Sequence, residues 1–294
     1  PVMETTDAIV GLHLRSLQPG DVAAGEWLSR EMGWNQNTAD WTYILSHGLG
    51  WGYEDDAGYL GATAMILPYG ERVAWICMVL VTASWRNRGI ATALLRHCIA
   101  QAEDRGWVPG LDATEAGRQV YLPMGFCDIL SLTRFKAEPF VGLEKPHDRT
   151  CRPMTKADLP AVVRLDEATA GASRAGLLES LHLRTPSLCW VVERDGIIEG
   201  FCMGRDGCDA DQIGPIVSAN DETAIALIGH ALQTRPEPLR RIYIDALTDQ
   251  KAFCLWLGDQ GFEKQRGFSR MLKGRSTPLG DPAPLFAIAG PELG

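Results

Sequence analysis

Hydrophobic and polar positions follow two periods along this chain, one typical of strands and one typical of amphipathic helices. In the first half, the pattern predicts strands at 9–16, 58–67, 72–81, 110–113 and 127–135 and helices at 21–32, 38–46, 89–101 and 115–124. In the second half, it predicts strands near 151 and at 188–194, 197–205, 212–218, 241–246 and 262–272, with helices at 156–168, 172–183, 221–232 and 249–260. This mixture predicts an α+β or α/β fold, and its recurrence predicts two copies of one fold.

Short segments also recur between the two halves. Residues 111–113 read Leu-Asp-Ala and residues 244–246 read Ile-Asp-Ala, and the helix predicted after each ends in Gly-Phe. The stretch 136–150, with two prolines and a cluster of charges, is typical of a linker. We therefore expect one domain over residues 1–144 and a second over 145–294. The second ends in a proline-rich tail from residue 274, for which the pattern predicts no packing site.

Length and composition agree with two globular domains. The chain has 294 residues, 46% of them hydrophobic and 22% charged, and domains commonly hold ~150 residues. The apolar stretch 75–81 is far shorter than the ~20 residues of a membrane-spanning helix. The first residues carry acid where a signal peptide would carry base. We therefore expect a cytoplasmic protein with no membrane partner.

The charge balance and the cysteines narrow the partners further. With 28 Lys and Arg against 37 Asp and Glu, the net charge is -9, whereas a nucleic-acid partner requires clustered positive charge. An acidic surface suits a cationic ligand better. The eight cysteines contain no Cys-x-x-Cys pair, so we expect neither a metal site nor a disulfide framework.

The most specific chemistry lies between residues 76 and 95. There an apolar strand enters a short basic loop that leads directly into an amphipathic helix. Backbone N–H groups at a helix N-terminus point toward an anion, and Gly89 and Ala91 let the backbone approach it closely. Arg86 and Arg88 add positive charge. The segment indicates a phosphate-binding loop, with an ordinary turn bearing solvated arginines as the alternative.

Two motifs resemble those of one enzyme family. The pattern Arg86-x-x-Gly89-x-Ala91 after an apolar strand resembles motif A of the GNAT superfamily of acyl-CoA-dependent N-acetyltransferases, and Tyr121-x-x-x-Gly125-Phe126 resembles its later Tyr-x-x-x-Gly-Phe motif. By the order of its elements, the chain is most similar to tandem two-domain GNAT proteins of the YitH-like kind. The resemblance implies that each domain is a mixed, mostly antiparallel sheet flanked by helices.

The resemblance also implies a cosubstrate and its binding residues. The cosubstrate is acetyl-CoA, and no metal is needed. The strand before the loop binds the pantetheine arm through its backbone, and the loop and helix start bind the pyrophosphate. These residues are Met78, Val79, Leu80, Val81, Arg86, Asn87, Arg88, Gly89, Ile90 and Ala91.

The same resemblance implies a reaction, in which the primary amine of a small molecule or peptide attacks the thioester directly in a ternary complex. Tyr121 occupies the family's general-acid position and would protonate the departing thiolate. Asp112, at the end of a predicted strand, is a candidate base; the alternative is that it caps the helix that follows. A non-catalytic regulator that binds acyl-CoA is the alternative function.

Acceptor residues are expected between the first two predicted helices, where GNAT proteins usually shape the acceptor pocket. Trp34, Asp40 and Trp41 lie there. An acid and a tryptophan together can hold an ammonium group by charge and cation–π contact. The alternative is that these three residues have core and surface roles.

The second half lacks the corresponding chemistry. Its loop at 218–222 reads Ser-Ala-Asn-Asp-Glu, has neither Gly nor Arg, and is three residues shorter. Two carboxylates would repel a pyrophosphate. Leu257 stands where the first half has Tyr121. We therefore expect that the second domain neither binds acetyl-CoA nor catalyses.

Overall fold

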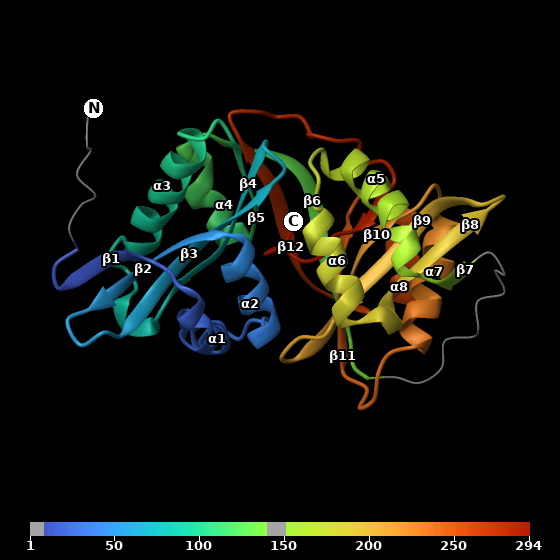
Figure 1. Cartoon of the computed structure of the whole chain (residues 1–294), viewed down its shortest axis with the longest axis horizontal. Coiled ribbons are helices and arrows are strands. Elements are labelled where there is room, and N and C mark those ends of the chain that lie inside the picture. The colour runs from blue at the N-terminus through green and yellow to red at the C-terminus, as the bar shows by residue number, and fades with distance from the viewer. Residues whose placement is uncertain (1–8, 140–150) are drawn as a thin grey trace. The chain divides into compact units, whose positions relative to one another are not determined.

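The computed structural model describes residues 9–139 and 151–294, and Figure 1 labels its α-helices and the strands β1 to β12. They form two compact units. Unit 1 consists of the residues up to Leu111 together with Leu293, and unit 2 consists of Asp112–Glu292 together with Gly294.

Unit 1 contains a sheet in the order β1-β2-β3-β4-β5. Neighbouring strands are antiparallel except for the parallel pair β4 and β5. Helices α1 and α2 pack on each other and on β3, and α3 packs on β3 and β4. The elements are β1 (Leu12–Ser16), η1 (Pro19–Asp21), α1 (Val22–Glu31), α2 (Thr38–His47), β2 (Leu49–Asp55), β3 (Leu60–Tyr69), β4 (Val73–Val81), η2 (Ala83–Trp85), α3 (Ile90–Glu103) and β5 (Val108–Ala113), which continues into unit 2.

Unit 2 contains strands in the order β12-β6-β11-β13-β10-β9-β8-β7. Helix α7 packs on β8, β9 and β10 and against α8. The elements are α4 (Glu115–Tyr121), η3 (Leu122–Met124), β6 (Phe126–Ala137), β7 (Cys151–Pro153), η4 (Lys156–Asp158), α5 (Leu159–Ala170), α6 (Ala175–Arg184), η5 (Pro186–Leu188), β8 (Trp190–Arg194), β9 (Ile197–Arg205), β10 (Ala210–Val217), α7 (Asp221–Gln233), β11 (Arg241–Leu247), α8 (Lys251–Asp259), β12 (Glu263–Lys273) and β13 (Leu285–Ala287).

The predicted mixture of strands and helices is confirmed, and two strands are additional. The pattern did not predict β2, because Gly50 and Gly52 interrupt its alternation of apolar and polar residues and glycine is depleted in strands. Packing explains Gly50, since a Cβ there would lie 2.1 Å from the sulfur of Met65. β13 lies in the proline-rich tail, where the pattern predicted no element.

A repeated ion pair marks the start of each half. Arg15 on β1 donates two hydrogen bonds to Asp21, at 2.9 and 2.8 Å, and Arg152 on β7 donates two to Asp158, both at 2.8 Å. The spacing is six residues in both cases, and each aspartate also accepts from the backbone N–H three residues before it. The halves therefore share local structure as well as element order.

The boundary between the two units follows strand pairing and not the repeat in the sequence. α4 and β6, which the pattern assigns to the first half, belong to unit 2 because β6 pairs with β12 over residues 126–136 and with β11 over residues 132–137. Lys136 and Ala137 are part of β6 and not of a linker, since both pair with β11. The predicted boundary at 144/145 lies outside the described residues and stays a prediction.

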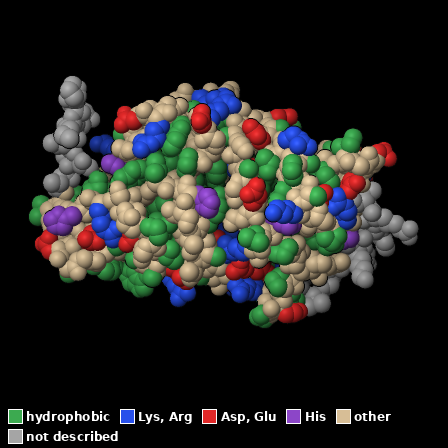
Figure 2. Space-filling view, in the orientation of Figure 1, with side chains coloured by type: hydrophobic (Ala, Val, Ile, Leu, Met, Phe, Trp, Pro, Cys, Tyr) green, Lys and Arg blue, Asp and Glu red, His purple; other side chains and the backbone are tan. Residues whose placement is uncertain are grey.

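The surface shows mixed charge. On the face drawn in Figure 2, acidic and basic side chains are interspersed and no broad basic patch is present. Among the described residues, none of the helices combines the length and the apolar character needed to cross a membrane.

Candidate functional site

The edge of β4 that faces β5 is the first part of the candidate site. Parallel pairing joins Val73–Trp75 to Val108–Gly110 and goes no further in the part of the chain that the structure describes. On its other side, β4 stays paired with β3 as far as Val81. Along residues 76–81, one edge of β4 therefore pairs with β3, and the edge toward β5 has no paired strand among the described residues. Such a strand edge can pair with an extended ligand that carries amide groups.

A bulge interrupts β4 within this segment. The register with β3 shifts so that Met78 and Val79 together stand opposite Ala64. Met78 has a φ of 51°, and its carbonyl oxygen accepts a hydrogen bond of 2.9 Å from the buried hydroxyl of Thr63. A positive φ at a non-glycine residue costs about 1–3 kcal/mol, and such strained residues cluster at active sites and ligand-binding segments. The strain coincides with the predicted pantetheine-binding residues.

The loop after β4 presents open backbone to the start of α3. Asn87 and Gly89 both have a positive φ, of 61° and 76°. Gly89 precedes α3, whose N-terminus receives no hydrogen bond from a capping side chain, and a Cβ on Gly89 would meet nothing within 4 Å. Because the first N–H groups of a helix have no partner within the helix, this start can bind an anion.

The loop arginines keep their charge uncompensated. Arg86 contacts the carbonyl oxygen of Val81 and the sulfur of Met32, and Arg88 donates to the carbonyl oxygen of Val10 at 2.9 Å. Neither guanidinium forms an ion pair with a carboxylate within residues 9–139 and 151–294. Both side chains are exposed, so their charge is available to a ligand.

Two contacts hold the base of the loop. The carboxylate of Glu31, at the end of α1, accepts from the Thr82 hydroxyl at 3.1 Å and from the Ala83 N–H at 2.9 Å. The ring of Trp85 lies against Gly61, where a Cβ would come within 2.6 Å of it. The contact of Glu31 with the loop was not predicted, because no spacing rule connects positions 31 and 82.

The corresponding loop in the second half is closed by its own side chains. The Asn220 side chain accepts from the Thr223 N–H at 2.9 Å and thus caps α7, and Asp221 accepts from the Phe253 N–H at 3.1 Å. Both Asp221 and Glu222 lie in the first turn of α7. Leu257 is fully buried in the core. The expectation that the second half binds no pyrophosphate stays a prediction, which these contacts favour.

Tyr121 lies at the end of α4 in unit 2. Its ring is 6.0 Å from that of Phe126, and burial raises the pKa of its phenol above the usual value of 10.0. The Tyr121 hydroxyl donates no hydrogen bond to any of the described residues. The phenol is therefore protonated at neutral pH and can donate a proton.

Asp112 has a structural partner. Both of its oxygens accept from Arg270, at 2.9 and 2.8 Å, and its side chain has no exposed surface. Burial raises the pKa of the Asp112 carboxyl, and the charge of Arg270 opposes that rise. The alternative interpretation of Asp112 as a helix cap is wrong, because the Thr114 hydroxyl caps α4 by accepting from the Gly117 N–H.

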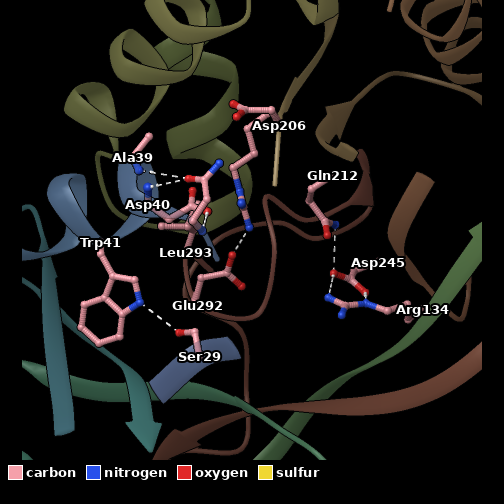
Figure 3. Close-up of polar contacts among 12 residues, drawn as sticks. Ser29, Ala39, Asp40, Trp41, Arg134, Asp206, Gln212, Asp245, Glu292 and Leu293 are labelled. Carbon is pink, nitrogen blue, oxygen red and sulfur yellow. Dashed lines mark hydrogen bonds and ion pairs between the residues drawn. The ribbon is translucent and has the colours of Figure 1, made fainter. Parts of the chain in front are cut away.

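The second half repeats this buried pair. Asp245 accepts from Arg134 at 2.7 Å through each oxygen and from the Gln212 amide at 3.0 Å (Figure 3). The recurrence of Asp in the two similar tripeptides therefore corresponds to a recurring ion pair. This favours a structural role for Asp112 over a role as base.

The structure supports packing and capping roles for two of the three predicted acceptor residues. Trp41 is fully buried, and its Nε1 donates to the Ser29 hydroxyl at 2.9 Å (Figure 3). Asp40 is 2% exposed and accepts from the Asn37 N–H in the capping box of α2. Trp34 is half-buried, and its acceptor role stays a prediction.

A pocket of about 330 Å³ lies on unit 1, and one of its lining residues, Tyr59, packs against Trp85 at the base of the loop. It is lined by Arg15, Asp21, Ala24, Trp27, Gly58, Tyr59 and Leu60. Its two charged residues bind each other, so it offers a ligand mainly the Trp27 and Tyr59 rings. No group of three or more His, Cys, Asp or Glu residues positioned to hold a metal ion occurs in the described ranges.

Comparison with protein families gives two matches. Residues 21–126 match the family described as acetyltransferase (GNAT) family, and residues 162–287 match the acetyltransferase (GNAT) domain. Among curated proteins, none is significantly similar to this chain.

Solved structures share the fold across both halves. An acetyltransferase candidate from Pyrococcus horikoshii is 18% identical with a TM-score of 0.75, over 97% of this chain and 96% of that one. A GCN5-related N-acetyltransferase from Sphaerobacter thermophilus is 16% identical with a TM-score of 0.66, over 90% and 96%. A tandem GNAT protein of the clavulanic acid biosynthesis pathway is 16% identical with a TM-score of 0.60, over 90% and 99%. At these identities the likeness concerns the fold.

Proposed function

This chain belongs to the acetyltransferase (GNAT) family and carries two GNAT domains in tandem, and from that premise we propose that it transfers an acetyl group from acetyl-CoA to the primary amine of a small molecule or peptide. The observation that carries the proposal is the loop before α3. It has an uncapped helix start, a left-handed Gly89, and two arginines that form no ion pair among the described residues.

The residues present fit a coenzyme A molecule in two places. The arginines of the loop, with Asn87 and the backbone N–H groups at Gly89, Ile90 and Ala91, would bind the pyrophosphate. The backbone of Met78, Val79, Leu80 and Val81 would bind the pantetheine arm, because an arm with two amides can pair with a strand edge as a peptide does. When bound, acetyl-CoA supplies an activated acyl thioester.

The bulge in β4 gives this chain donors for the reacting carbonyl. Backbone N–H groups around Met78 and Val79 would donate to the thioester oxygen, on which negative charge develops during attack. A preorganised donor of this kind contributes about 3 kcal/mol to lowering a barrier. The pairing of β4 with β3 and the hydrogen bond from Thr63 to Met78 fix the bulge, so the protein's own contacts hold these donors in place.

Two proton transfers complete the reaction. We assign Tyr121 as the acid that protonates the departing thiolate, since burial keeps its phenol protonated. The amine must lose a proton before attack, because an alkyl amine with a pKa near 10 is mostly protonated at pH 7. Asp112 is poorly suited to that step, since Arg270 engages both of its oxygens.

Thiol release from acetyl-CoA with a panel of amines tests the proposal, with binding measured by calorimetry. We expect binding, and turnover on at least one amine. Binding without turnover on any amine would support the regulator instead, and absence of binding would refute both. Arg86→Gln should weaken binding, whereas Arg105→Gln, which changes an exposed arginine after α3, should leave it unchanged.

A further inference from the structure

The C-terminal segment 284–289 lies inside the sheet of unit 2. Its strand β13 pairs with β10 through Ile216↔Ala287 and Val217↔Leu285, and with β11 through Ala246↔Ala287. Two backbone hydrogen bonds extend the pairing, from the Ser218 N–H to the Pro284 oxygen at 2.9 Å and from the Ile288 N–H to the Asp245 oxygen at 3.0 Å. The segment is therefore a strand inserted between two others.

The strands on either side are the counterparts of β4 and β5. β10 and β11 are parallel and pair from Ala210 to Ile213, after which β13 enters between them. In the first half, the parallel pairing of β4 and β5 ends in the same way at Trp75. The edge proposed above to bind pantetheine thus has an equivalent in the second half, and there it is occupied by the chain itself.

The bulge also has an equivalent. The register of β10 with β9 shifts between Ile213 and Ile216, and Gly214, inside the shift, has a φ of 145°. A Cβ on Gly214 would lie 1.9 Å from the carbonyl oxygen of Ile288. The segment therefore passes directly over the bulge, at a position where only glycine leaves room for it.

The segment is part of the core of unit 2. Leu285, Phe286, Ala287 and Ile288 are each exposed by 3% or less, and the Phe286 ring packs against that of Phe253 at 5.4 Å. The Gln250 side chain donates to the carbonyl oxygens of Ala283 and Leu285, both at 2.9 Å. Further along, Glu292, labelled in Figure 3, forms a buried ion pair with Arg205.

We propose that residues 284–289 are a permanent internal occupant of the second half's pantetheine-type site. Their backbone groups satisfy the edges of β10 and β11, as the amides of a bound cofactor would. Together with the capped, acidic start of α7, they close this half to acyl-CoA and let it stay folded without a ligand. The comparison with pantetheine rests on the proposed function, whereas the occupancy does not.

Hydrogen exchange on the full chain, with and without saturating coenzyme A, tests this. Without ligand, we expect amides of 285–289 to exchange on the order of 10³-fold or more slowly than in an unfolded chain, like other core strands. With coenzyme A, we expect slower exchange at 78–81 and no change at 285–289. Rapid exchange of 285–289 in the free protein would overturn the proposal.

The other outcomes separate the two proposals. If coenzyme A speeds exchange at 285–289 and slows it at 216–217, the ligand displaces the segment. That result would overturn the proposal that the segment occupies the site permanently. If coenzyme A changes neither 78–81 nor 216–217, the proposed function fails, while a protected 285–289 still supports internal occupancy.

A matched pair of variants gives a second readout. Ala287→Asp places a charge at a fully buried position of β13, and Ala283→Asp makes the same change at the exposed residue that directly precedes the segment. We expect Ala287→Asp to lower the melting temperature and to remove the exchange protection of 216–217. Ala283→Asp should do neither. Equal melting temperatures for the two variants would overturn the proposal.

Discussion

The left-handed backbone at Gly89 yields the sharpest quantitative prediction. In Gly89→Ala the added Cβ meets nothing within 4 Å, so the whole effect comes from holding an L-residue at a φ of 76°. That conformation costs about 1–2 kcal/mol. Gly106, which follows α3 with a φ of 72°, also has open space around its Cβ position. Gly106→Ala therefore carries the same backbone cost at a position outside the loop.

The two variants should differ in affinity, and Gly89→Ala should lose no more stability than Gly106→Ala. Without ligand, an alanine at 89 can leave the left-handed region, and binding must then restore it. The apparent dissociation constant for coenzyme A therefore rises by the full cost, roughly 5- to 30-fold for 1–2 kcal/mol. Gly106→Ala should bind as the wild type does. Titration calorimetry measures the affinities, and thermal unfolding compares the losses of stability.

Two results would refute this reasoning. If Gly106→Ala weakens binding as much as Gly89→Ala, the effect reports general destabilisation and not the loop. If Gly89→Ala binds with wild-type affinity at normal stability, the left-handed conformation is not needed for binding, and the loop is not the pyrophosphate site.

Three further predictions concern unit 2. Tyr121→Phe should lower kcat on the order of 10²-fold with unchanged coenzyme A affinity. Because burial raises the pKa of the Tyr121 phenol, deprotonation of Tyr121 should not lower the wild-type rate until the pH exceeds the usual phenol pKa of 10.0. A Tyr121-dependent decline near pH 8 would contradict the assignment. Asp245→Ala leaves Arg134 buried without its main partner and should cost about 3–5 kcal/mol of stability, which lowers the melting temperature by roughly 6–20 °C. The control Asp128→Ala, at the more exposed pair with Arg118, should change the melting temperature little. Equal falls for the two variants would show that burial of the pair is unimportant. Residues 1–144 expressed alone should aggregate or self-associate, because β6 would lack the strands that pair with both its edges; a soluble monomer in size-exclusion chromatography would contradict the observed pairing.

Local pattern predicted the elements whose periodicity is uninterrupted. Helix α3 and strand β4 follow from the apolar run and the loop between them, and the order of elements recurs because the halves share a fold. β2 and β13 were missed because their residue types oppose the strand pattern: two glycines leave room for neighbouring side chains, and prolines surround β13.

The candidate site was predictable only where its residues are contiguous in sequence. The loop from Arg86 to Ala91 has a fixed spacing, so its residues could be named in advance. Contacts between distant positions, such as Arg270 with Asp112, depend on which strands become neighbours. For the same reason, Trp41 looked like an acceptor residue in sequence, although its ring is packed in the core.

The pairing of β6 with strands of the second half also affects the order in which the chain can fold during synthesis. Its partners in β11 lie about a hundred residues further along the chain, as Phe135↔Ile244 shows, and those in β12 follow later still. Contacts between such distant segments slow folding, and a strand with both edges unpaired is prone to associate with other chains while it waits. The newly made first half therefore leaves the ribosome with its last strand unpaired. This predicts that the nascent chain depends on chaperones until residue 273 has emerged.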